Sequence, residues 1–187
     1  MFLRKTKRRE PVPVTMSGVR MGERLLQIGI DDAAVAGAIA AKVGLSGNAA
    51  AAVADDAAAA RARASATDAG VLVDVQVTPV DHLPFADGAF DVVVVHSTGG
   101  FLAGLASDMR TAAAREWHRV LRHGGRAITI EAGPRGGLGA LLRGGGGAAA
   151  AADPAAGGLA VLEGGSFRPV RVVGELEGFK FTEGLKS

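Results

Sequence analysis

Short apolar runs alternate along the chain with alanine-rich segments that follow acidic residues. Buried strands are predicted at the apolar runs 24–29, 50–54, 71–77, 91–95 and 126–131. In the fourth run valine occupies every position from 92 to 95, which is typical of a strand covered on both faces, as in parallel sheets. Helices are predicted at 33–42, 56–69 and 107–122. Because strands and helices alternate, the pattern predicts an α/β domain with a parallel sheet and right-handed crossovers.

Cap and turn residues mark the ends of these elements. The acidic pairs 31–32 and 55–56 suit the N-caps of the first and second helices, because a carboxylate accepts the free N–H groups there. The glycine pair 124–125 is predicted to end the third helix. Near the C-terminus, residues 167–173 and 179–183 read as two strands joined by a turn. The parallel sheet is therefore expected to finish with an antiparallel hairpin.

Composition limits the classes of protein to consider. The chain has 187 residues, of which 48% are hydrophobic, enough for one folded domain with a buried core. It has no cysteine, which excludes disulfides, zinc–cysteine sites and thiol nucleophiles, and no metal site is predicted. No apolar run reaches the roughly 18 residues of a transmembrane helix, and no apolar segment typical of a secretory signal follows the first basic residues. We therefore expect a cytoplasmic protein.

Positive charge is concentrated at the N-terminus. The net charge is +2, yet the first nine residues contain five basic side chains: Arg4, Lys5, Lys7, Arg8 and Arg9. A solvated tail is the simpler interpretation, and contact with nucleic acid or an anionic membrane is the alternative. Pro11 and Pro13 predict an extended linker after this arm. The predicted organisation is a basic arm and linker at 1–23 and one domain at 24–187.

Two longer patterns and the terminal hairpin together resemble a known family. In the segment 80–95, an acidic residue follows a strand, then comes an apolar Leu-Pro-Phe turn, and Phe-Asp opens the next strand. In the segment 114–128, a helix is followed by a basic residue, Gly-Gly and a strand. In this order they resemble class I S-adenosylmethionine (SAM) dependent methyltransferases of the type 11 kind. The resemblance covers about 24–186 and implies a Rossmann-like, mostly parallel seven-stranded sheet with a C-terminal antiparallel hairpin.

The resemblance also implies where the adenosine part of SAM would bind. Asp81 matches the acidic residue that accepts from the adenine amine, and Leu83 with the backbone near it, including His82, would flank the ring. Asp55 or Asp56 falls where the family holds the ribose hydroxyls with an acid after the second strand. A carboxylate suits that role because it accepts two hydroxyl hydrogen bonds at once. The alignment does not choose between the two.

The first loop departs from the family pattern of an acid followed by Gly-x-Gly-x-Gly. Gly29 is retained, but Gln27 replaces the acid, Asp31 the second glycine and Ala33 the third. Loss of a charge-assisted bond, a carboxylate facing the cofactor's own carboxylate and an added β-carbon would together weaken SAM binding by ~2–4 kcal/mol. The resemblance still implies a cofactor site that includes Gln27, Gly29 and Asp31.

For the chemistry, the resemblance implies in-line methyl transfer, in which the protein supplies proximity, alignment and sometimes a base. His96, after the fourth strand, is the candidate base at the mouth of the cofactor site; the alternative is a histidine that caps backbone groups at a strand end. Aromatic residues are only 4%, and no basic patch interleaved with aromatics is found in the predicted domain, which disfavours specific nucleic-acid binding. A small-molecule acceptor is therefore expected. The competing hypothesis is a catalytically inactive member of the fold that serves as a binding or regulatory module.

Overall fold

A computed structural model describes residues 9–133 and 154–187. The first eight residues of the basic arm and the Gly/Ala-rich segment at 134–153 lie outside the described residues. The strands are β1 (Arg24–Ile28), β2 (Asn48–Val53), β3 (Val73–Val77), β4 (Phe90–Ser97), β5 (Leu121–Ala132), β6 (Val170–Leu176) and β7 (Phe179–Leu185). The helices are α1 (Val12–Met16), α2 (Ala33–Ala41), α3 (Asp56–Ala69), α4 (Phe101–Gly104), α5 (Ser107–Val120), the 3-10 turn η1 (Pro154–Ala156) and α7 (Gly158–Gly164).

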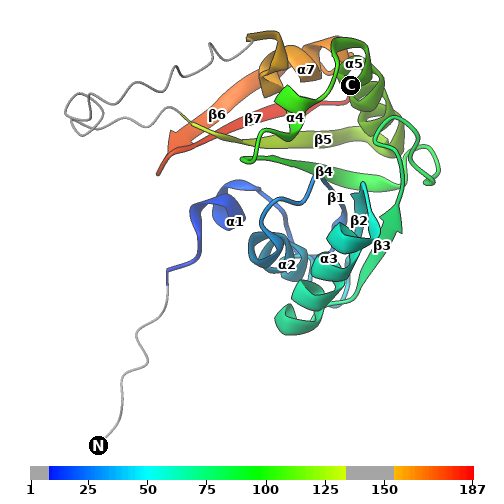
Figure 1. Cartoon of the computed structure of the whole chain (residues 1–187), viewed down its shortest axis with the longest axis vertical. Helices are drawn as coiled ribbons and strands as arrows, with labels where there is room; N and C mark the ends of the chain where they lie inside the picture. The colour runs from blue at the N-terminus through cyan, green and yellow to red at the C-terminus, as the bar shows by residue number, and fades with distance from the viewer. Residues whose placement is uncertain (1–8, 134–153) are drawn as a thin grey trace, which may run out of the picture.

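The seven strands form one sheet in the order β3-β2-β1-β4-β5-β7-β6. Strands β1 to β5 pair in parallel, whereas β7 is antiparallel to both β5 and β6. Helices α1, α2 and α3 lie on one side of the sheet, and α4, α5 and α7 lie on the other (Figure 1). The structure therefore confirms the α/β fold and the C-terminal antiparallel hairpin expected from the sequence.

The central strands are buried on both faces, as the valine run of β4 predicts. Leu26, Val93 and Trp117 belong to the core between the sheet and helices α5 and α7. Leu25 and Val92 belong to the core on the opposite face, which α1 and α2 cover. Successive residues of a strand point to opposite faces, so each central strand contributes to both cores. None of the helices within 9–133 and 154–187 is long and apolar enough to cross a membrane.

Asp91 ties together the amino ends of three strands. Its carboxylate accepts the backbone N–H of Arg24 at 2.8 Å and the Nε of the same residue at 3.1 Å. It also accepts Nε of Arg122 in β5. Burial opposes the charged form of Asp91, but these hydrogen bonds outweigh it and lower the pKa of the carboxyl well below its usual range. Asp91, at the start of β4, is thus a structural clamp between β1, β4 and β5.

The acidic caps predicted for the first two helices are present. Asp32 accepts the backbone N–H of Val35 at 3.1 Å, and Asp55 accepts that of Ala58 at 2.7 Å. Each satisfies an N–H group that has no partner within its helix. Oδ1 of Asp55 therefore caps the start of α3.

Two local predictions are wrong. The segment with two prolines contains helix α1 and not an extended linker, because Pro11 is its N-cap and Pro13 lies in the first turn, where proline needs no N–H partner. Val14 of this helix is only 1% exposed and packs in the core beside α2. The predicted third helix, α5, ends at Val120, before the glycine pair, and Leu121 already pairs with β4 and is fully buried.

Candidate functional site

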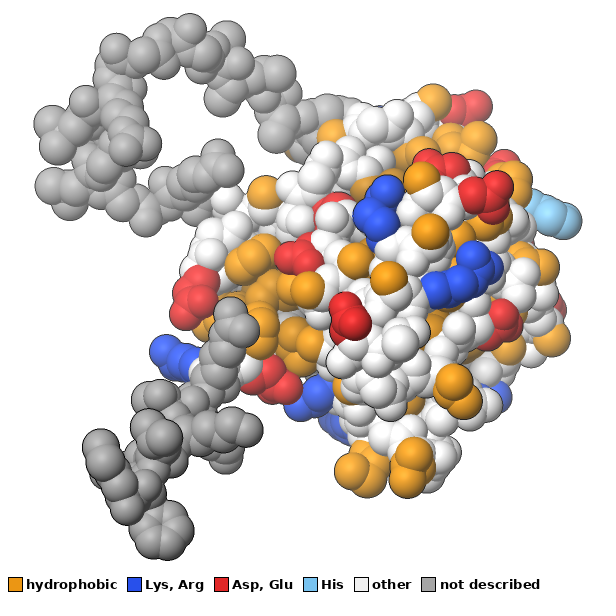
Figure 2. Space-filling model, turned by 60° about the horizontal axis from the view of Figure 1, so that its bottom comes forward, with side chains coloured by type: hydrophobic (Ala, Val, Ile, Leu, Met, Phe, Trp, Pro, Cys, Tyr) orange, Lys and Arg blue, Asp and Glu red, His pale blue; other side chains and the backbone are white. Residues whose placement is uncertain are grey.

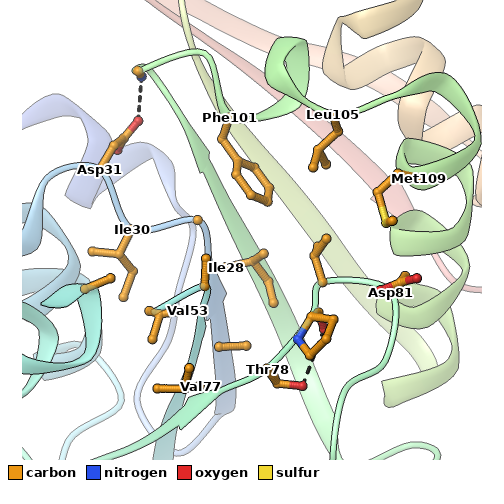
Figure 3. Close-up of a pocket in the computed structure, with 17 residues that line it drawn as sticks. Ile28, Ile30, Asp31, Val53, Val77, Thr78, Asp81, Phe101, Leu105 and Met109 are labelled. Atoms are coloured by element: carbon orange, nitrogen blue, oxygen red, sulfur yellow. Dashed lines mark hydrogen bonds between the residues drawn. The ribbon is translucent and has the colours of Figure 1, made fainter. Parts of the chain in front are cut away.

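A pocket opens at the carboxyl ends of β1, β2 and β3 and beside the loop that follows β4. The chain runs from β1 outward to β3 and then returns to place β4 on the other side of β1, so the pocket lies where the strand order reverses. Ligands of open α/β sheets bind at such a position. The pocket has a volume of about 590 Å³. Figure 3 shows its walls, which are formed mainly by apolar side chains, among them Ile28, Ile30, Val53, Val77, Phe101, Leu105 and Met109.

Asp31 joins the two loops at one end of this pocket. It follows β1, and its Oδ2 accepts the hydroxyl of Thr98 at 2.8 Å and the backbone N–H of Gly99 at 2.6 Å. Both donors belong to the loop after β4. The carboxylate lines the pocket, as the close-up shows (Figure 3). Asp31 therefore has a structural role between loops and leaves a negative charge at this end of the pocket.

Gly29 is covered by a side chain of the protein itself. It has a φ of +66°, and a β-carbon on it would lie 2.8 Å from Cγ of Phe101 and 2.9 Å from the backbone oxygen of His96. Phe101 is positioned by α4, where the N–H of Leu102 donates to Oγ of Ser97 at 2.9 Å. The space that glycine leaves open at this point is thus filled by an aromatic ring.

Gln27 and His96 form a buried pair beneath helix α2. Oε1 of Gln27 lies 2.9 Å from Nε2 of His96, and Nε2 of Gln27 donates to the carbonyl of Ala36 at 3.0 Å. Since the glutamine amide is the donor toward Ala36, its oxygen accepts, and Nε2 of His96 carries the proton. Burial lowers the pKa of His96 to about 4, so the ring is neutral at pH 7.

Neither member of this pair lines the pocket. Gln27 is 1% exposed and His96 is 2% exposed. Strand β4 extends to Ser97, so His96 lies inside the strand and not after it. It shares its side of the sheet with Val92 and Val94, which face α2. The structure therefore does not bring His96 to the mouth of the pocket, where the sequence placed it as a base.

At the end of β2 the pocket is lined by Val53 and not by an acid. Asp55 caps α3, and Asp56 is exposed in the first turn of that helix. Neither carboxylate lines the pocket. The predicted ribose site thus has an apolar side chain at the strand end.

At the other end, Asp81 lines the pocket, whereas His82 and Leu83 do not. His82 is exposed, and Leu83 is 3% exposed. The backbone N–H of Leu83 donates to Glu116 at 3.0 Å, and its carbonyl accepts from Arg119 at 3.0 Å. The backbone of Leu83 is therefore occupied by helix α5.

Of the predicted site residues, Gly29, Asp31 and Asp81 come together around the pocket. The sequence reading missed the wall formed by Phe101, Leu105 and Met109. A signal for it was present, because an apolar Phe-Leu-Ala-Gly-Leu run follows the two glycines after β4. Side chains so placed after a strand that ends at the pocket are expected to cover it.

The strand order and the position of the pocket are those of a Rossmann-like methyltransferase fold. Residues 26–129, more than half of the chain, match a family model described as a methyltransferase domain. The chain belongs to this family of class I SAM-dependent methyltransferases. No match was found among curated proteins.

Solved structures share the fold. A SAM dependent methyltransferase from Aquifex aeolicus is 17% identical, with a TM-score of 0.66, and the match covers 93% of this chain and 87% of that chain. A 16S rRNA methyltransferase from T. thermophilus, in complex with AdoMet and guanosine, is 17% identical, with a TM-score of 0.56, and covers 96% of this chain and 40% of that one. The cyclase SpnF is 24% identical, with a TM-score of 0.51, and the match covers 64% of this chain and 42% of that chain. Since a cyclase is among these structures, the shared fold does not decide the reaction.

The residues around the pocket fit one part of SAM and not the other. An adenosine group matches the apolar walls at Val53 and Val77 and the carboxylate of Asp81. The methionine group carries an ammonium and a carboxylate. Gln27 is buried away from the pocket, Phe101 fills the space over Gly29, and Asp31 presents a negative charge. Among the described residues, the pocket lining therefore matches the chemistry of an adenosine group but not that of a methionine group.

Proposed function

We propose that this chain is a ligand-binding member of the methyltransferase family, whose pocket takes an adenosine-type small molecule, SAM or a related nucleoside. The observation that carries the proposal is the carboxylate of Asp81. It lines a largely apolar pocket, and within the described residues it accepts no hydrogen bond. An adenine amine supplies the donor that this carboxylate lacks, and the flat ring suits the apolar walls.

Methyl transfer from SAM to a small-molecule acceptor is the second candidate function. Family membership favours it, and Leu105 and Met109 offer an apolar wall against which an acceptor could lie. The missing methionine site argues against it, as does the burial of His96, which removes the candidate base. We rank adenosine binding first because it requires only groups that the pocket presents.

A small molecule suits this pocket better than a nucleic acid does. Lysine and arginine do not occur among the residues that line it. On the face shown in Figure 2, basic side chains are separated by acidic and apolar ones and form no continuous stripe. Recognition of a nucleic-acid backbone requires such a stripe. Most of the basic arm lies outside the described residues, so a solvated tail stays its simpler interpretation and contact with an anionic surface the alternative.

Calorimetric titration of the full chain with adenosine, SAM and S-adenosylhomocysteine tests the proposal. We expect heat with adenosine, and a roughly tenfold or greater loss of affinity in Asp81→Ala, because the adenine amine loses its acceptor. Asp87→Ala is the control, since Asp87 is exposed and does not line the pocket. Absence of heat at millimolar ligand, in a protein shown to be folded, would overturn adenosine binding.

Methyl transfer needs its own measurement. The chain is incubated with SAM and a pool of small amines, alcohols and thiols, and S-adenosylhomocysteine is quantified by mass spectrometry. If it forms above the level of an Asp81→Ala sample, the second function stands. If it does not form while adenosine binds, the chain is a binding module alone.

A further inference from the structure

The charged groups of the pocket are all of one sign. Among the residues that line it, Asp31 and Asp81 are the ionisable ones, and no lysine, arginine or histidine joins them. Figure 3 shows the two carboxylates on opposite sides of the pocket, with apolar side chains such as Ile28 and Phe101 between them. The pocket therefore has an apolar middle and a negative charge at each end.

Asp31 also uses the donors that an anionic ligand would need. The N–H of Gly99 and the hydroxyl of Thr98 both donate to its Oδ2. These donors are neutral, so they orient the carboxylate without cancelling its charge. Its Oδ1 has no hydrogen bond from the described residues and is available to a ligand.

We infer that the pocket selects adenosine-type ligands that have no carboxylate or phosphate at the 5′ end and prefers those that carry a positive charge there. This inference rests on the proposed adenosine binding, with the adenine at Asp81 and the 5′ group at Asp31. An ammonium near Oδ1 of Asp31 is attracted, whereas a carboxylate in the same place is repelled and finds no free donor at Gly99. Decarboxylated SAM, an aminopropyl sulfonium, meets these requirements.

Two ligands isolate the effect, because SAM and decarboxylated SAM differ only in the carboxylate. Calorimetric titration of the full chain with adenosine, 5′-methylthioadenosine, decarboxylated SAM, SAM and ATP gives the order of affinity. We expect decarboxylated SAM to bind about tenfold or more tightly than SAM. Adenosine and 5′-methylthioadenosine should fall between them, and ATP should bind most weakly.

The variant Asp31→Asn removes the charge but keeps an oxygen that can accept from Gly99 and Thr98. It should weaken the binding of decarboxylated SAM and strengthen the binding of SAM, so that the two affinities come close to one another. Asp68→Asn, at an exposed position of α3, makes the same change of net charge away from the pocket and should leave the ratio unaltered.

The outcomes separate this inference from the proposed function. If adenosine binds, but SAM binds as tightly as its decarboxylated form or Asp31→Asn leaves the ratio unchanged, the inferred selectivity is wrong and adenosine binding stands. If none of the nucleosides binds to the folded chain, the proposed function itself fails. Equal changes of the ratio in Asp31→Asn and Asp68→Asn would show an effect of net charge and overturn the role of Asp31.

Discussion

Nε2 of His96 lies 2.9 Å from Oε1 of Gln27, and both side chains are buried beneath α2. The family pattern has an acid at the position of Gln27, and the position of His96 after the predicted fourth strand made it a candidate base, with a structural histidine as the alternative. In this chain the two satisfy each other, and the amide group of Gln27 also satisfies the carbonyl of Ala36. The pair is therefore part of the core, and its removal should change stability more than ligand binding.

Gln27→Ala tests that role. The substitution leaves the Nε2–H of His96 and the carbonyl of Ala36 without their side-chain partner in a buried place. We expect the free energy of unfolding to fall by about 1–3 kcal/mol, as measured by chemical denaturation. Gln76→Ala is the matched control, because within the described residues the side chain of Gln76 bonds only to exposed Asp74, and its loss should cost less than about 1 kcal/mol. Equal losses in the two variants would contradict a structural role for the pair.

The low pKa of His96 predicts a dependence of stability on pH. Burial lowers the pKa from 6.5 to about 4 in the folded chain, so between these values the unfolded chain binds more protons. The contribution of neutral His96 to the free energy of unfolding should therefore be fully present above pH 6.5. The free energy of unfolding should decline by up to about 3 kcal/mol as the pH falls to 4. The measurement is denaturation at several pH values. His96→Gln should flatten the decline in this window, and an unchanged slope would show that other groups cause it.

Asp91 should contribute more to the free energy of unfolding than a nearby surface carboxylate does. Asp91→Ala removes the acceptor of the Arg24 backbone N–H and of two guanidinium groups, so we expect a loss of about 1–3 kcal/mol in the free energy of unfolding. Asp87→Ala breaks an ion pair with Arg119 in which Asp87 is 81% exposed, and it should cost less than about 1 kcal/mol. If the order were reversed, Asp91 would not be a clamp.

The fold could be predicted from local sequence patterns because each strand, helix and cap has its own signal. The valines of β4, Asp32 and Asp55 are interpretable from neighbouring residues alone. The site was harder to predict because successive residues of a strand point to opposite faces of the sheet. β4 ends two residues later than predicted, so His96 lies in the core and not at the mouth of the pocket.

Other features of the site depend on contacts between distant residues. Phe101 covers Gly29 across more than seventy positions of sequence, and Glu116 occupies the backbone of Leu83 from another helix. The sequence allowed Asp55 to hold the ribose or to cap α3; its Oδ1 caps α3, and the residue does not line the pocket. Local pattern does not rank such competing partners, since the choice is made by tertiary packing.

Gly29 should tolerate no larger residue, for two separable reasons. Its φ of +66° strains any side chain, and a β-carbon would meet Cγ of Phe101 at 2.8 Å. We expect Gly29→Ala to lower the free energy of unfolding by about 2–4 kcal/mol, through backbone strain and overpacking. Gly70→Ala is the control for strain alone, because Gly70 has a φ of +67° and no atom within 4 Å of the added carbon. It should cost only about 1 kcal/mol.

The contact with Phe101 accounts for the difference between these glycines. In the double variant Gly29→Ala/Phe101→Ala the ring is gone, so the added carbon meets only the backbone oxygen of His96 and the strained φ. The double variant should therefore lose less stability than the sum of the single variants, with an interaction of at least about 0.5 kcal/mol in a double-mutant cycle by chemical denaturation. Strict additivity, or equal costs for Gly29→Ala and Gly70→Ala, would show that the ring of Phe101 does not destabilise a β-carbon at position 29.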